Sequence, residues 1–193
     1  MKNFFVLGMA LVLVSATTAM ADKPAQKGAI KSGLQPGQSV GAFYVTKLAG
    51  AEEDGVAEGK NLCYRCRNGS KPQVMVFTRS TDPKVTELVS KLDAAIAKNA
   101  DSKLTVFVNV LNEDKEDASK IAKQFASTTK AKNIPFVVPN ENANGPDNYG
   151  INPKADVTIV MANEGNVKAN YAVDDAKQLD IDAVIENIGK IVD

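Results

Sequence analysis

Short apolar runs alternate with longer stretches of helical spacing along this 193-residue chain. Residues 73–78 and 104–111 are largely apolar runs bounded by polar residues, which is typical of strands that are buried on both faces. Residues 134–138 predict a third, shorter strand. Residues 156–161 and 167–173 predict a hairpin, because the Asn-Glu-Gly-Asn sequence between them favours a turn.

Three amphipathic helices are predicted between and after these strands. The first has Asp82 as its N-cap and Pro83 at its first helical position, and it is expected to end at Asn99. The second follows residues 112–114, and the third has Asp180 as its N-cap. The apolar positions that recur at helical spacing are Val85, Leu88, Val89, Leu92, Ala95 and Ile96, then Ala118, Ile121, Ala122 and Phe125, and finally Ile181, Val184, Ile185, Ile188, Ile191 and Val192.

The order of these elements predicts an α/β protein with a three-layer sandwich, in which helices flank a mixed central sheet. Right-handed crossover connections make the first strands parallel, and the hairpin adds an antiparallel edge. Before the first of these strands, residues 34–45 predict a Pro-Gly turn that leads into a short strand, and residues 49–60 predict an exposed loop without a hydrophobic pattern.

The N-terminus predicts export. Residues 1–21 resemble a signal peptide, with Lys2 before an apolar stretch and the small-x-small site Ala19-Met20-Ala21 at its end. Residues 22–33 are polar and are expected to be flexible. Residues 34–193 are expected to form one domain of periplasmic or secreted location, without a membrane segment after cleavage of the signal peptide.

Composition excludes several kinds of function. The chain contains no histidine, which excludes histidine-based triads and removes the usual imidazole metal ligand. Loss of residues 1–21 removes one base and no acid, so the 23 basic and 23 acidic residues become 22 and 23, a net charge of −1. We therefore expect no nucleic-acid or membrane partner, and no cofactor is predicted.

Several short motifs are similar to those of the thioredoxin-like superfamily, in its peroxiredoxin/redoxin (AhpC/TSA-like) branch. Pro36-Gly37 followed by Phe43-Tyr44-Val45 resembles the entry segment of redoxins. Ile134-Pro135-Phe136 and Tyr149-Gly150-Ile151 resemble the segment before their hairpin, and Glu164-Gly165-Asn166-Val167 resembles the hairpin turn. The resemblance covers about residues 34–192 and implies a thioredoxin-like fold with thiol chemistry.

The resemblance also shows what is missing. The reactive cysteine of this superfamily lies in the turn between the first core strand and the first long helix, which corresponds here to residues 78–83 and contains no cysteine. The proline that precedes the hairpin strand in thioredoxins would fall near Val157 and is also absent. The resemblance therefore implies a redoxin-type fold without a peroxidase site.

The only cysteines of the chain are Cys63 and Cys66, which form a C-x-x-C pair before the first core strand. Sites in open α/β sheets form at the carboxyl ends of the strands, so the pair is displaced from the family's site. One interpretation is a structural disulfide, which suits an exported protein although the closed loop is short.

A second interpretation is a redox pair. Arg65 and Arg67 would favour the thiolate form, with Cys63 attacking, Cys66 resolving, and Tyr64 helping to dock a protein dithiol or disulfide partner. A zinc site would have to be shared between subunits, since the chain provides two thiolates and no histidine. The leading hypothesis is a thiol-disulfide role and not a peroxidase, either as a specialised oxidoreductase that uses Cys63 and Cys66 or as a protein that inherited only the fold. The alternative is a non-catalytic binding or structural module.

Overall fold

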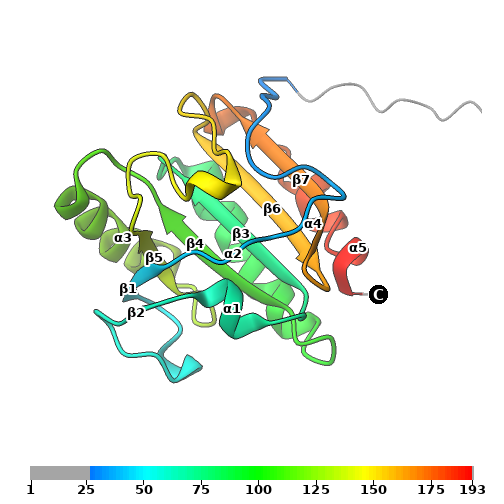
Figure 1. The fold of residues 1–193 in the computed structure, drawn as a ribbon, viewed down its shortest axis with the longest axis horizontal. Helices are drawn as coiled ribbons and strands as arrows, with labels where there is room; N and C mark the ends of the chain where they lie inside the picture. The colour runs from blue at the N-terminus through cyan, green and yellow to red at the C-terminus, as the bar shows by residue number, and fades with distance from the viewer. Residues whose placement is uncertain (1–26, 193) are drawn as a thin grey trace, which may run out of the picture.

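The computed structural model describes residues 27–192, and its strands form one seven-stranded mixed sheet (Figure 1). The strands are β1 (Val45–Ala49), β2 (Asn61–Leu62), β3 (Gln73–Thr78), β4 (Thr105–Val110), β5 (Phe136–Pro139), β6 (Val157–Asn163) and β7 (Asn166–Val173). Their order in the sheet is β2-β1-β5-β4-β3-β6-β7. Strands β3, β4 and β5 are parallel, and β6 and β7 form an antiparallel hairpin that continues the sheet beyond β3.

Helices cover the two faces of this sheet unequally. The α-helices are α1 (Tyr64–Asn68), α2 (Pro83–Lys98), α3 (Lys115–Thr129), α4 (Ile181–Glu186) and α5 (Gly189–Val192), and the 3-10 helices are η1 (Glu52–Asp54), η2 (Asp147–Tyr149) and η3 (Ala176–Gln178). Side chains of α2 to α5 join one hydrophobic core on the back face. The front face has a second core (Figure 1). This core is covered by α1, by residues 27–44, which we call the N-terminal segment, and by the loop with η2.

Local sequence explains the two long helices. Asp82 caps α2 by accepting a hydrogen bond from the Lys84 N–H at 2.9 Å, and Asn99 is the C-cap. Asp114 caps α3 in the same way through the Asp117 N–H at 2.9 Å. Such caps satisfy N–H groups that have no partner inside the helix. The predicted bounds of the first helix and the predicted α/β sandwich are both confirmed.

The elements before β3 differ most from the prediction. The first strand begins at Val45 and pairs with both β5 and β2, and neither β2 nor α1 was predicted. Residues 49–60 are not a fully exposed loop, because they contain η1 and bury the side chains of Ala51 and Val56. These elements depend on pairing between distant residues, which leaves little local signal. The predicted C-terminal helix is divided into α4 and α5, although its N-cap Asp180 is confirmed.

Residues 27–33 are more ordered than expected. The Ile30 N–H donates to the Ala172 carbonyl at 3.1 Å, and the hydroxyls of Ser32 and Thr158 are hydrogen-bonded at 2.6 Å. The prediction of flexibility is therefore wrong for residues 27–33, because they occupy the open edge of β7. Residues 1–26, including the predicted signal peptide, lie outside the described residues. Within 27–192, no helix has the length and apolar character needed to span a bilayer.

Candidate functional site

The turn between β3 and α2 is the place where the resemblance would put a reactive cysteine. Residues 78–83 form this turn, and none of them is a cysteine. Its arginine, Arg79, is half-buried and donates to the carbonyls of Ala155 at 3.1 Å and Ala143 at 2.9 Å. Burial lowers the pKa of Arg79. The turn is thus clamped to the loop that precedes β6, and it provides no thiol.

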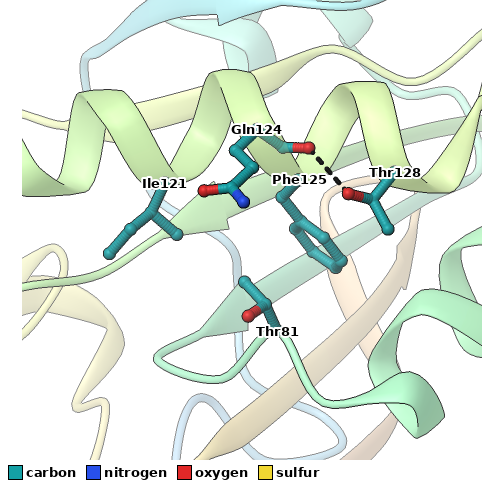
Figure 2. Close-up of a pocket in the computed structure, with 5 residues that line it drawn as sticks. All are labelled: Thr81, Ile121, Gln124, Phe125 and Thr128. Carbon is teal, nitrogen blue, oxygen red and sulfur yellow. Dashed lines mark hydrogen bonds between the residues drawn. The ribbon is translucent and has the colours of Figure 1, made fainter.

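A small pocket lies beside this turn (Figure 2). It has a volume of about 120 Å³ and is lined by Thr81 and by four residues of α3: Ile121, Gln124, Phe125 and Thr128. The Thr128 hydroxyl donates to the Gln124 carbonyl at 3.0 Å. None of the five side chains is acidic, basic or a thiol. The pocket therefore offers no group for redox or acid-base chemistry.

The two cysteines form a disulfide at the beginning of α1. The S–S distance between Cys63 and Cys66 is 2.06 Å. Cys63 is the N-cap residue of α1, and its Sγ accepts a hydrogen bond from the Cys66 N–H at 3.0 Å. The disulfide therefore closes the first turn of this helix, and the predicted pairing is confirmed.

The two cysteines differ in exposure. Cys63 is buried, with 8 % of its surface exposed, whereas Cys66 belongs to the exposed residues. A C-x-x-C pair that exchanges with another molecule needs one accessible sulfur for the mixed disulfide and a second sulfur close to it. The structure provides this asymmetry, with Cys66 as the outer residue.

The helix that carries the disulfide lies on the front face of the sheet (Figure 1). The Tyr64 ring stacks on Phe107 of β4 with 5.7 Å between the ring centroids. Arg65 Nε donates to the Val40 carbonyl at 3.1 Å. The expectation that Tyr64 contributes to an exposed docking surface is wrong, because its side chain is buried in the front core.

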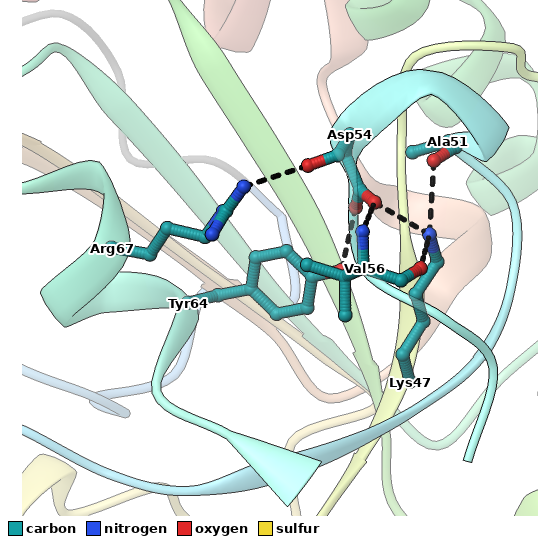
Figure 3. A network of polar contacts seen from close by, with 6 residues as sticks. All are labelled: Lys47, Ala51, Asp54, Val56, Tyr64 and Arg67. Carbon is teal, nitrogen blue, oxygen red and sulfur yellow. Dashed lines mark hydrogen bonds and ion pairs between the residues drawn. The ribbon is translucent and has the colours of Figure 1, made fainter. Parts of the chain in front are cut away.

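A buried lysine organises the loop next to this helix (Figure 3). Only 1 % of Lys47 is exposed, and its Nζ donates to the carbonyls of Ala51 at 2.9 Å and Val56 at 2.8 Å. Its third contact is an ion pair with Asp54 Oδ1 at 2.7 Å. The three N–H donors of the ammonium group are therefore all matched by acceptors.

Asp54 connects that loop to α1 (Figure 3). The Tyr64 hydroxyl donates to Asp54 Oδ2 at 2.6 Å, and Arg67 Nη2 donates to the Asp54 main-chain carbonyl at 2.8 Å. Burial, together with the hydrogen bond to Asp54 and its negative charge, raises the pKa of Tyr64. Asp54 thus holds one residue on each side of Cys66.

The two arginines that were predicted to support the redox pair, Arg65 and Arg67, donate hydrogen bonds to main-chain atoms. Arg65 and Arg67 donate to carbonyls, and neither forms an ion pair with a carboxylate in the described part of the chain. Two positive charges therefore flank Cys66 without a paired negative charge. Within residues 27–192, no group of three or more cysteine, aspartate or glutamate side chains is arranged to hold a metal ion.

Neither Lys47 nor Asp54 was predicted from the sequence as part of a site. Lys47 lies in the five-residue strand β1, and a lysine is normally solvated. Its burial follows from the fold of the loop over it, which has no hydrophobic pattern. Asp54 precedes Gly55, a turn signal that says nothing of the partners of the carboxylate.

No profile of a known protein family and no curated protein matches the sequence. Solved structures do match the fold. A proposed thiol:disulfide interchange protein, DsbE from Chlorobium tepidum, has 15 % identity and a TM-score of 0.55, with 80 % of this chain and 98 % of that one covered. A proposed protein disulfide isomerase from Bacteroides thetaiotaomicron has 14 % identity and a TM-score of 0.58, with 83 % and 92 % covered.

AhpC from Mycobacterium tuberculosis is similar to the same degree, with 14 % identity, a TM-score of 0.54, and 81 % of this chain and 96 % of that one covered. At such identities the likeness concerns the fold and not the activity. The seven-stranded sheet, the helices on its faces and these matches show that the chain has a thioredoxin-like fold of redoxin type, with a C-x-x-C disulfide between Cys63 and Cys66.

Proposed function

We propose that this chain is a thiol-disulfide oxidoreductase that uses the Cys63–Cys66 disulfide. The observation that supports the proposal most is the asymmetry of the pair: Cys66 is exposed, while Cys63 is buried and its sulfur accepts the Cys66 N–H. This arrangement favours Cys66 as the residue that meets the partner. It reverses the order of attack that analogy with other C-x-x-C proteins suggests.

The exchange proceeds in two steps that balance. A partner thiolate attacks the Cys66 sulfur, the S–S bond breaks, and its electron pair leaves on Cys63 as a thiolate. The Cys66 N–H, which already donates to this sulfur at 3.0 Å, stabilises that thiolate. A second partner thiolate then displaces Cys66, so the partner becomes a disulfide and the chain takes up two electrons and two protons. A disulfide of another molecule reoxidises the chain by the reverse reaction.

The partner in this proposal is an exported protein with a dithiol or disulfide. Signal-peptide-like residues 1–21 support a location outside the cytoplasm, where disulfides persist. The guanidinium groups of Arg65 and Arg67 beside Cys66, which donate to carbonyls and not to carboxylates, favour the approach of a partner thiolate to the Cys66 sulfur. Neither of the family's usual features, a cysteine in the β3–α2 turn or a proline before the hairpin strand, takes part.

The reduction potential of the Cys63–Cys66 pair, measured together with the exchange of the oxidised protein with a dithiol peptide, tests the proposal. We expect a potential in the range of exported exchange proteins, above about −300 mV, and transfer of the disulfide to a dithiol peptide. Cys63→Ser and Cys66→Ser should both abolish the complete transfer. A potential well below that range, without any exchange, would rule the proposal out.

The second candidate is a non-catalytic module with a structural disulfide. It is favoured by the position of the pair outside the β3–α2 turn, where the fold normally provides a site. In that case, replacement of both cysteines by serine would lower the free energy of unfolding by about 2 kcal/mol at most, because the closed loop is short. Partner capture by the folded double variant, unchanged from the wild type, would support this candidate.

A further inference from the structure

The contacts around Asp54 suggest a role beyond holding a loop. The two side chains of α1 that reach Asp54 are Tyr64 and Arg67, which lie on either side of Cys66 in the sequence. Tyr64 also lies between the two cysteines. A movement of Asp54 would therefore be transmitted to the backbone that carries both sulfur atoms.

Asp54 itself is held in place by a buried charge. Its Oδ1 accepts from Lys47 Nζ at 2.7 Å and from the Val56 N–H at 2.8 Å, while its Oδ2 accepts from the Tyr64 hydroxyl at 2.6 Å. Lys47 is in turn fixed in β1, which pairs with β5 in the sheet. The chain of contacts thus runs from the rigid sheet through Lys47 and Asp54 to α1 (Figure 3).

Burial of such an ion pair is costly, because both charges lose their hydration. An apolar side chain at the position of Lys47 would pack beneath the loop at a lower desolvation cost. It would not, however, orient a carboxylate towards the Tyr64 hydroxyl. The ion pair thus fixes the orientation of the Asp54 carboxylate and, through the Tyr64 hydroxyl, the position of α1.

We infer that Asp54, oriented by Lys47, is a positioning residue that keeps the sulfur atoms of Cys63 and Cys66 close together in the reduced protein. Two thiols held close have a high effective concentration with respect to each other, which favours the disulfide. Loss of the network frees α1 to move, and the disulfide becomes easier to reduce. The inference deepens the proposed function, since it concerns the redox poise of the same pair.

The Asp54 network and the Cys63–Cys66 disulfide are thermodynamically linked. If the network favours the disulfide, then the disulfide must favour the network to the same degree. Reduction of the wild-type protein should therefore loosen the loop over Lys47. The amide N–H of Val56, which donates to Asp54, should exchange with solvent faster in the reduced protein than in the oxidised one.

The test is the equilibrium of the full chain with reduced and oxidised dithiothreitol, read as the fraction of free thiols. Asp54→Asn and Tyr64→Phe should each shift this equilibrium by about three- to tenfold towards the dithiol, because each removes or weakens the hydrogen bond that the Tyr64 hydroxyl donates to the Asp54 carboxylate. Tyr171→Phe is the matched control. Like Tyr64→Phe, it removes a hydrogen-bonded tyrosine hydroxyl, but this hydroxyl donates to the Ala183 carbonyl and lies on the back face of the sheet.

Tyr64→Phe keeps the ring on Phe107, so it retains the packing of the front core even if Asp54→Asn fails to fold. An equilibrium in Tyr64→Phe equal to that of Tyr171→Phe, with no change in Val56 exchange on reduction, would overturn the inference. The test needs no protein partner. Absence of exchange with peptides would therefore contradict the proposed function and leave the positioning result intact.

Discussion

Lys47 is the residue whose surroundings depart most from its usual behaviour. A lysine is almost never fully buried unless it is paired, and Lys47 meets that condition with one carboxylate and two carbonyls. Removal of the ammonium group leaves Asp54 partly buried without its counter-charge. Substitution of Lys47 should therefore destabilise the protein, although β1 has only five residues.

Replacement of Lys47 by methionine, which keeps the length of the side chain, should lower the free energy of unfolding by about 3 to 5 kcal/mol, because it breaks a buried ion pair. Urea denaturation measures the loss. Lys91→Met is a control, since Lys91 forms its ion pairs with Glu87 and Asp182 in solvent. A loss at Lys47 no greater than that of the control would show that the buried pair has little structural effect.

Tyr64 should make stability depend on alkaline pH. Its pKa is raised above the usual value of 10.0, first by burial and then by its hydrogen bond to Asp54. The protonated phenol therefore contributes stability that is complete below pH 10 and is lost as the pH rises further. Above that pH, the free energy of unfolding should fall more steeply for the wild type than for Tyr64→Phe. Parallel curves for the two proteins would contradict this assignment.

At the scale of elements, the best predicted parts are those with strong local signals. The bounds of α2 follow from Asp82, Pro83 and Asn99, and β3 follows from its apolar run. By contrast, β2 has two residues and α1 has five, which is too short for a periodic pattern. Their formation depends on β1, on the disulfide and on the Asp54 contacts, none of which a local pattern reveals.

The N-terminal segment is an element without regular structure that protects the edge of β7. Its close approach to the sheet requires Gly33, which has φ +74°. A Cβ at this position would lie 2.7 Å from Cγ2 of Thr158. The exposed edge strand that β7 would otherwise present is a template for unwanted pairing.

Gly33→Ala should therefore destabilise the protein by more than the cost of a left-handed backbone alone, which is about 1 to 3 kcal/mol. Gly37→Ala is the matched control, because Gly37 has φ +89° and no atom within 4 Å of a Cβ. Thermal denaturation of the two variants separates the strain from the clash. Equal losses would mean that the segment yields easily at Thr158 and does not pack closely.

At the scale of the molecule, the two faces of the sheet have different roles. The back face, covered by α2 to α5, forms the larger core, and its helical and strand patterns were predictable from the sequence. The front face carries the disulfide, the Lys47 network and an aromatic cluster around Phe43. The cysteine pair could be found from the sequence alone, but its difference in exposure could not, because that depends on how α1 packs against β4.

In the proposed exchange, the sulfur of Cys66 meets the partner and the sulfur of Cys63 stays within the protein. The reaction of the two single-cysteine variants with oxidised glutathione, followed by mass spectrometry, compares the two sulfur atoms. Cys63→Ser, which leaves Cys66, should form the mixed disulfide at least about tenfold faster than Cys66→Ser, because a buried thiol is poorly reactive. Equal rates, or a faster reaction of the variant that keeps Cys63, would show that Cys66 is not the residue that meets the partner.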